Sequence, residues 1–180
     1  LNKKKSDLDL VVVDKARFLD AVDMYFLWKE LDQRIRSSAT RGINFPETIS
    51  EALCCYAMDF RWNKGSSGDA VNVSNGQHRI IEIKATSNWN LDTTSFSPKE
   101  EFDDLFFLRL DKRNDKLYIY DTGVNSERLK QIKVNQSETL GEQQLAGRRP
   151  RFSVIKFIIE PGDIQPVAVV DIREKKITKL

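Results

Sequence analysis

The sequence is poor in the residues that form disulfides and structural zinc sites. Among its 180 residues it has two cysteines, Cys54 and Cys55, and one histidine, His78. Adjacent cysteines are poorly placed to join distant parts of a fold, and a structural zinc site needs about four Cys or His ligands. A disulfide framework and a usual zinc site are therefore excluded. This cysteine usage is typical of a reducing cytoplasm, and it leaves hard oxygen ligands for any metal.

Long apolar runs and an excess of one charge are also missing. The longest apolar runs, such as 11–13 and 157–159, fall far below the roughly 18 residues of a membrane span, so we predict no transmembrane helix. The lysines at 3–5 are not followed by the apolar segment of a signal peptide. With 29 basic and 27 acidic residues, the net charge of +2 means that any contact with nucleic acid must rest on a local patch.

The apolar content is sufficient for one hydrophobic core. Hydrophobic residues make up 40% of the chain and charged residues 31%, which excludes a disordered protein. We therefore predict a single domain over 1–180. Its expected parts are an N-terminal helical region (1–46), a core that carries the central strands (47–122) and a region that closes the sheet (123–180).

Two helices are predicted in the N-terminal third. Apolar residues recur at helical spacing from Asp14 to Arg36, and no Gly or Pro interrupts them. A second helical pattern runs through Ile49 to Trp62, and Pro46 suits its first turn.

Strands are expected in the middle and at the end of the chain. Strand patterns at 69–73 and 79–85 flank Asn75-Gly76, a hairpin signal, and Ser97 to Glu100 is typical of a capping box that opens a short helix. Further predicted segments are strands at 105–110 and 117–120, a polar helical region up to Gly147, and a last strand at 167–172. This order predicts an α/β or α+β fold, with a central mixed sheet flanked by helices.

Three charged residues are predicted to converge on the hairpin. Because side chains alternate along a strand, Glu82 and Lys84 project from one face while Ile81 and Ile83 project from the other. Asp69 begins the neighbouring strand, so the turn can fold it back towards Glu82.

Such a cluster suits Mg²⁺ and phosphodiester hydrolysis. Two neighbouring carboxylates, Asp69 and Glu82, repel each other unless a cation lies between them, and Mg²⁺ prefers carboxylate oxygens. Lys84 could then orient a water molecule and offset phosphate charge. The alternative is a structural ion pair, since Glu-x-Lys is common by chance; Glu174-Lys175-Lys176 has the same spacing in a charged turn. Ionic side chains interleaved with isoleucines favour the catalytic interpretation.

An acidic residue on the second helix is a fourth candidate. Glu51 shares a predicted apolar face with Met58 and Trp62. It could complete the metal site or tune Lys84, or it could be a rim residue or pair with Arg61.

These residues resemble the core of the PD-(D/E)xK nucleases. The matching positions are Asp69, Glu82-Ile83-Lys84 and the upstream Glu51, and the small size resembles the type II restriction endonucleases. Similarity continues through 97–103 and 147–153 to the small enzymes that cut short, GC-rich interrupted palindromes. The resemblance covers about 49–172. One departure is Gly68, which stands where the family motif has proline.

The resemblance implies a mechanism and partners. Asp69 and Glu82 would bind Mg²⁺, Lys84 would assist the attacking water, and both strands of double-stranded DNA would be hydrolysed. Two active sites would come from a homodimer, for which 1–46 is a candidate interface. The setting would be the bacterial cytoplasm, and a companion DNA methyltransferase is left open. The competing functions are a structure-specific repair or junction-resolving nuclease and a non-catalytic DNA-binding subunit.

Basic residues in the last third are the candidate DNA contacts. Arg148, Arg149 and Arg151 form a dense cluster. Arginine can bind guanine bidentately or clamp phosphate, and we expect base reading by at least one of them, with a solvated or phosphate-only patch as the alternative. Asn88 and Lys156 complete the predicted DNA-binding set.

The polar stretch 87–95, which follows the proposed catalytic strand, could enter a DNA groove. Its alternative is an ordinary loop with Trp89 in the core. His78 is interpreted as a surface residue rather than a general base, and Met24 as part of the core or a dimer interface.

Overall fold

The computed structural model describes residues 8–74, 76–97 and 101–180. Its elements, in chain order, are β1 (Leu10–Val12), α1 (Lys15–Ser38), α2 (Glu47–Met58), β2 (Arg61–Asn63), β3 (Ala70–Ser74), β4 (Gln77–Thr86), β5 (Thr94–Ser95), β6 (Asp104–Asp111), β7 (Lys116–Asp121), α3 (Ser126–Lys130), α4 (Leu140–Leu145), β8 (Arg151–Phe152), the π-helix η1 (Ile155–Ile159), β9 (Ala168–Asp171) and β10 (Lys176–Lys179).

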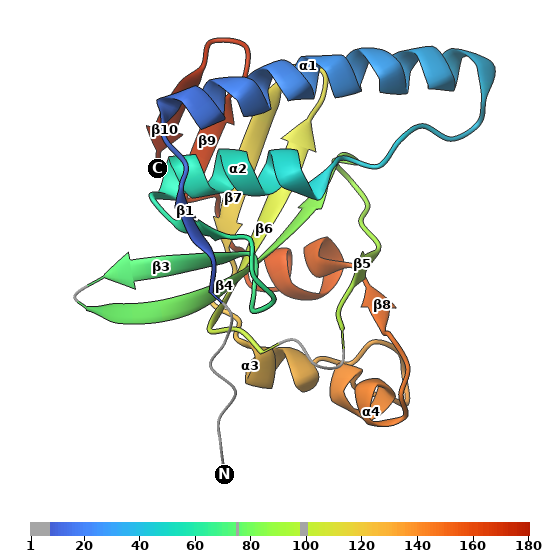
Figure 1. Cartoon of the computed structure of the whole chain (residues 1–180). Coiled ribbons are helices and arrows are strands. Elements are labelled where there is room, and N and C mark those ends of the chain that lie inside the picture. The colour runs from blue at the N-terminus through green and yellow to red at the C-terminus, as the bar shows by residue number, and fades with distance from the viewer. Residues whose placement is uncertain (1–7, 75, 98–100) are drawn as a thin grey trace.

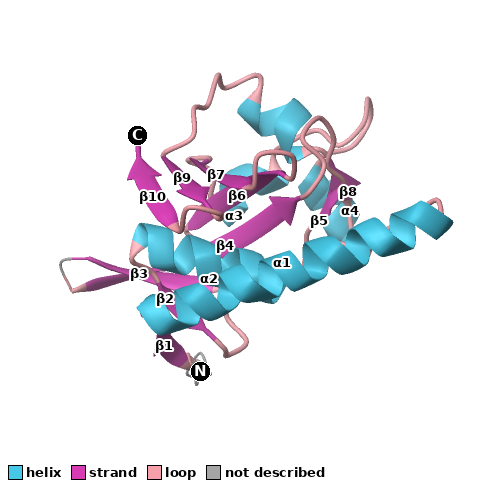
Figure 2. Cartoon of the chain, turned by 90° about the horizontal axis from the view of Figure 1, so that it is seen from above, coloured by secondary structure: helices cyan, strands magenta, loops and turns pink. Residues whose placement is uncertain are grey.

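One mixed sheet organises the molecule. Its strand order is β1-β2-β3-β4-β6-β7-β9-β10, and β5 and β8 form a separate two-stranded sheet. Within the large sheet β4 is parallel to β6, whereas the other neighbouring pairs are antiparallel. Helices lie on both sides of the sheet (Figures 1 and 2). The predicted mixed sheet flanked by helices is confirmed.

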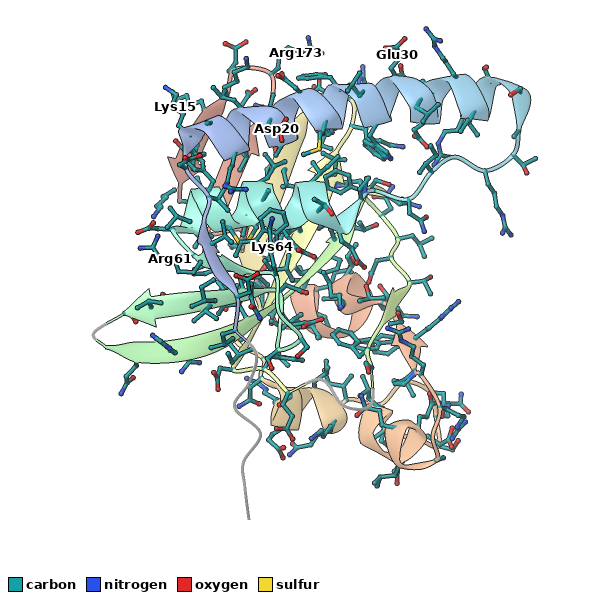
Figure 3. The ribbon with its side chains drawn as sticks, in the orientation of Figure 1. Lys15, Asp20, Glu30, Arg61, Lys64 and Arg173 are labelled. Carbon is teal, nitrogen blue, oxygen red and sulfur yellow. The ribbon has the colours of Figure 1, made fainter. Side chains whose placement is uncertain are left out.

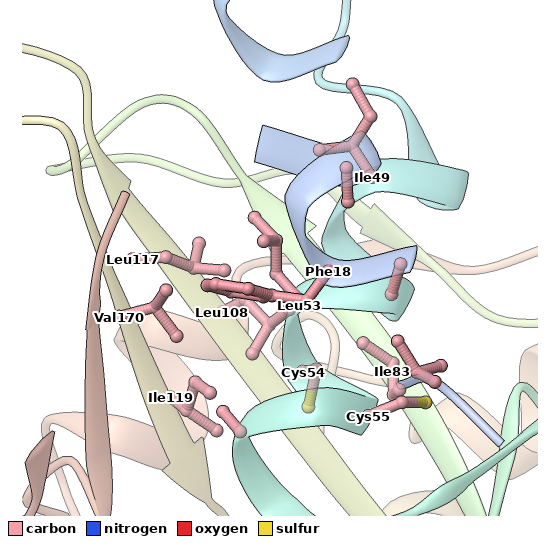
Figure 4. Packing of buried hydrophobic residues seen from close by; sticks show 14 of the residues in the cluster. Phe18, Ile49, Leu53, Cys54, Cys55, Ile83, Leu108, Leu117, Ile119 and Val170 are labelled. Carbon is pink, nitrogen blue, oxygen red and sulfur yellow. The ribbon is translucent and has the colours of Figure 1, made fainter. Parts of the chain in front are cut away.

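The two faces of the sheet bury separate apolar clusters. On β6, Phe106 and Leu108 belong to the cluster under α1 and α2, while Leu105 and Phe107 belong to the cluster on the other face, which includes residues of α3, α4 and η1. This alternation is the period of two that a strand buried on both faces shows. Figure 4 shows side chains of β6, β7 and β9 gathered with Phe18 of α1 and residues of α2.

The first helix was predicted closely. The side chain of Asp14 caps its N-terminus by accepting a hydrogen bond from the backbone N–H of Arg17. Phe18, Val22 and Tyr25 are buried at helical spacing, as the sequence pattern indicated. The C-terminal part of α1 extends past the sheet (Figure 1), so its outer face carries exposed apolar side chains.

The second helix is shorter than predicted. It ends at Met58, because Asp59 adopts a left-handed conformation with φ of 60° and its backbone N–H closes the helix onto the carbonyl of Cys55. The prediction that the helix continues to Trp62 was wrong, since Trp62 lies on β2. Pro46 is the N-cap residue and precedes the first turn.

The predicted strands of the hairpin, of β6 and β7, and of β9 are all present. Five short or edge strands, β1, β2, β5, β8 and β10, were not predicted. β10 pairs with β9 and begins at Lys176, so 167–172 is not the last strand. The prediction of a helical region up to Gly147 was also wrong. Only the short helices α3 and α4 form there, and an isolated bridge between Lys133 and Thr139 lies between them. Asn75 and Pro98 to Glu100 lie outside the described residues, and the predicted turn and capping box lie partly there.

Candidate active site

Strand β4 places the predicted Glu82 and Lys84 at the centre of the sheet. Its first half pairs with β3 and its second half, from Ile81 to Thr86, pairs with β6. Ile81 and Ile83 pack in the cluster under α1 and α2, so Glu82 and Lys84 face the other side. Glu82 is only 3% exposed and forms an ion pair with Lys84, whose ammonium also lies 5.7 Å from the centre of the Phe96 ring. A buried carboxylate of this kind needs such a cation.

Asp69 is fixed at the point where β3 and β4 part. Its carboxylate accepts a hydrogen bond of 2.7 Å from the backbone N–H of Ile83, and its own N–H donates to the carbonyl of Ile81. The side chain thus replaces a strand partner for Ile83. This hydrogen bond joins Asp69 to the strand that carries Glu82 and Lys84.

Gly68 explains the departure from the motif's proline. Its φ is +69°, a value that proline cannot adopt. A Cβ atom here would lie 2.4 Å from the side chain of Ile80 and 3.1 Å from the carbonyl oxygen of Ile81. Glycine is therefore required for the chain to approach β4 closely enough to seat Asp69.

Glu51 lies close to this site but on the opposite face of the sheet from the Glu82 side chain. Its carboxylate accepts a hydrogen bond of 2.8 Å from the indole Nε1 of Trp62. Burial and, after it, the negative charge of Asp69 raise the pKa of Glu51 to about 7, against the opposing effects of the Trp62 hydrogen bond and the Lys84 charge. The partner of Glu51 is thus Trp62 rather than Arg61. The sequence pattern placed Glu51 and Trp62 on one face of a single helix. The two side chains do meet, although Trp62 belongs to strand β2.

The carboxylates present fit a metal that keeps much of its water. Among the described residues no group of three or more His, Cys, Asp or Glu side chains could hold a metal ion. Glu82 lies on β4, and the Asp69 carboxylate bonds the backbone N–H of Ile83 on the same strand, while the negative charge of Asp69 also acts on Glu51 of α2. Two hard carboxylates with open positions suit Mg²⁺, which is usually bound through one or two carboxylates and retains waters.

A cavity of about 600 Å³ opens where the C-terminal end of β4 leaves the sheet. Lys84 lines it from β4, and Asn88 and Arg149 line it from segments far apart in the sequence. Arg36 from the end of α1 and Asp92 from the loop after β4 line it too. The volume lies in the range of small-molecule sites, but its walls are mostly polar, which suits a phosphate-bearing substrate better than an apolar ligand.

The predicted DNA-binding residues are divided by the structure. Arg149 and Asn88 share the cavity with Lys84. Arg148 does not line it and is paired with Glu138, whose pKa falls to about 2 mainly because of the hydrogen bonds from Arg148. Arg151 and Lys156 are exposed outside the cavity, on β8 and η1.

Trp89 is not a core residue. It is 37% exposed, the Arg109 guanidinium lies 4.3 Å from the centre of its ring, and Tyr118 packs edge-on at 5.0 Å. The alternative in which Trp89 enters the core was therefore wrong. His78 is exposed, as predicted.

Sequence reasoning missed Arg36 and Asp92. Arg36 is the last basic residue of α1. Its Nε donates hydrogen bonds of 3.0 and 2.9 Å to the two carboxylate oxygens of the buried Asp32. No local pattern marks either residue, because their places depend on segments distant in sequence. An aspartate within the polar stretch 87–95 was the only available signal for Asp92.

Within the described part of the chain, no helix combines the length and apolar character that crossing a membrane requires.

Comparison with known proteins identifies the family of this chain. The family described as Bsp6I restriction endonuclease matches residues 13–161. The type II restriction enzyme Bsp6I of Bacillus sp. (strain RFL6) is 63% identical over 172 residues, which cover 96% of this chain and 98% of that protein. No solved structure matches the chain. The predicted type II restriction endonuclease is confirmed over a repair nuclease or a non-catalytic subunit, and the chain belongs to the Bsp6I restriction endonuclease family.

Proposed function

We propose that this endonuclease hydrolyses double-stranded DNA with Mg²⁺ held by Asp69 and Glu82. The observation that carries the proposal is the ion pair of Glu82 with Lys84 beside Asp69, at a cavity that Arg149 also lines. The family and the relative support site-specific cleavage of DNA.

The roles of the side chains follow from their surroundings. Glu82 fixes the Lys84 ammonium, and Lys84 lines the cavity, where it can orient an attacking water and offset the charge of the phosphate. Glu51, with a pKa of about 7, can hold or release a proton at neutral pH near Asp69 and Lys84. When bound, Mg²⁺ supplies positive charge that stabilises the negative charge developing on phosphate oxygens.

The DNA contacts are proposed in two groups. Arg149 and Asn88 line the same cavity as Lys84, so a strand that reaches Lys84 passes within their reach. We assign base reading to Arg149. Arg148, Arg151 and Lys156 are exposed outside the cavity, where phosphate contacts suit them better.

A homodimer would supply one active site for each DNA strand. A twofold protein matches a twofold DNA site, and the exposed side chains of Leu27 and Leu31, one helical turn apart on α1, support an interface in 1–46. Sedimentation of the free chain tests this, and a monomer that stays a monomer on DNA would contradict it. A companion methyltransferase and a cytoplasmic location stay predictions.

The function is tested with purified chain and long, unmethylated linear duplex DNA, in Mg²⁺ or in EDTA. Discrete fragments in Mg²⁺ alone are expected, and sequencing their ends gives the site. Preferential cleavage of branched or mismatched duplexes would instead support a structure-specific nuclease. Binding without cleavage under any divalent metal would contradict the proposal.

A further inference from the structure

A single buried aspartate joins the loop after β4 to the segment that follows the arginine cluster. Asp92 is 6% exposed and lines the cavity. Its carboxylate accepts hydrogen bonds of 2.6 Å from the hydroxyls of Thr94 and Ser153, of 2.8 Å from the N–H of Val154 and of 3.1 Å from the N–H of Ile155. Three of these donors lie 61 to 63 residues away in the sequence.

The chain between Lys84 and Asp92 is held in a defined path. The hydroxyl of Thr86 lies within hydrogen-bond distance of the carbonyls of Asn88 and Leu91, each at 3.2 Å, and accepts from the N–H of Asn88 at 3.1 Å. The position of Asp92 is therefore tied to the catalytic strand.

The pairing of β5 with β8 also links the segment after Asp92 to the segment after Arg149. Strands β5 and β8 pair Thr94 with Phe152 and Ser95 with Arg151, and the ring of Phe152 stacks on Phe96 at 5.5 Å. Arg149 lies two residues before β8 and on the wall of the cavity. The chain that follows Arg149 is thus fastened first by β5, at 151–152, and then by Asp92, at 153–155.

We propose that Asp92 is a positioning residue for DNA recognition: it sets the place of Arg149 relative to Lys84, so that a base is read in register with the bond that is cut. The inference rests on the proposed function. Asp92 is assigned no catalytic role, because its carboxylate holds Thr94 and the 153–155 segment, whereas Glu82 and Lys84 lie on β4 and pair with each other.

The test is Asp92→Asn. Asparagine keeps the shape of the side chain, but an NH₂ group replaces one carboxylate oxygen and cannot accept the hydrogen bonds that this oxygen accepts. Steady-state cleavage of a duplex that contains the site found by end sequencing should show KM raised about tenfold or more, with kcat changed less than about threefold. A double-mutant cycle with Arg149→Ala should be non-additive: in the Arg149→Ala background, Asp92→Asn should add little to KM.

Asp115→Asn is the matched control. Asp115 is 2% exposed and likewise binds several donors, from Tyr25, Lys29 and Arg173, but it does not line the cavity. Asp115→Asn should lower the unfolding temperature without changing KM.

Ser153→Ala is a second variant for the case in which Asp92→Asn fails to fold. It removes one of the four donors to Asp92 and should also raise KM.

Several results would overturn the inference. These are an unchanged KM, a fall in kcat alone, additive effects in the cycle, no effect of Arg149→Ala, or an equal rise in KM for Asp115→Asn. Failure of the proposed function is separate, since it would appear as absence of cleavage by the wild-type chain.

Discussion

The two faces of the sheet differ in how regular they are and in what they do. The face under α1 and α2 buries one cluster, to which each helix contributes apolar side chains at helical spacing and the strands contribute the rest. The other face is covered by α3, α4, β5, β8 and η1, all of them short and joined by long-range hydrogen bonds, and it receives the side chains of Glu82 and Lys84. One face is a scaffold, and the other carries the segment for which we propose a role in DNA recognition.

The two buried aspartates show the same difference. Asp115 binds Tyr25 and Lys29 of α1 and Arg173, which lies beside α1 (Figure 3), so it fastens the scaffold helix to the β6–β7 turn. Asp92 fastens two loops beside the cavity. Comparable hydrogen bonding thus joins a helix to a turn in one place and two loops beside the cavity in the other.

The largest effect should come from the face that carries the proposed catalytic residue Lys84. Lys84→Ala should abolish cleavage while the folded protein still binds DNA, although its stability should fall, because the substitution removes the ammonium that pairs with the buried Glu82 carboxylate. Cleavage assays and the mobility of a labelled duplex measure the two properties. Cleavage at the normal rate would remove Lys84 from the mechanism.

A substitution in the cluster under α1 and α2 should lower stability and leave substrate binding unchanged. Leu53→Ala, at a fully buried position of α2, should lower the free energy of unfolding by about 2–5 kcal/mol while the surviving folded protein keeps its KM. Urea denaturation measures the loss. Leu27→Ala, at a position 68% exposed on α1, is the control and should change stability by less than about 0.5 kcal/mol in the monomer. A changed KM for Leu53→Ala would contradict the division of the two faces.

Arg149→Ala should weaken specific binding by about 1–3 kcal/mol if Arg149 reads guanine. Binding is compared on cognate and random duplexes at fixed salt. Arg34→Ala is the control, since Arg34 is exposed on α1 and pairs with Glu30 away from the cavity. An equal loss on cognate and random DNA would make Arg149 a phosphate contact.

The smallest expected effect is on how stability depends on pH through Glu51. The pKa of Glu51 is raised from 4.5 to about 7 in the folded chain, so folding favours its protonated form. Its contribution to stability is present in full below about pH 4.5 and is lost as the pH rises towards 7. Urea denaturation in EDTA should therefore show Glu51→Gln to be less sensitive than wild type to pH in this window. Parallel curves for the two proteins would contradict the assigned pKa.

Local patterns were sufficient for the scaffold and for the catalytic strand. The apolar period of α1, the alternation of β4 and the turn between β6 and β7 are each contained in a short window, and the structure agrees with them. Placing Asp69 against Ile83 also needed only a hairpin.

The rest depended on contacts between distant segments. The end of α2 follows from a left-handed Asp59, which apolar periodicity does not reveal. β10 is a polar edge strand that exists because β9 lies beside it. Asp92 is defined by donors about 60 residues away, so no pattern around it could mark its role.

The central claim is that the carboxylates beside Lys84 bind Mg²⁺ for cleavage, and Asp69→Ala tests it most directly. Wild type and variant are incubated with long unmethylated duplex DNA in Mg²⁺, and binding is measured in parallel. The account predicts discrete fragments with wild type and none with Asp69→Ala, although the variant folds and still binds DNA. Undiminished cleavage by Asp69→Ala would contradict it.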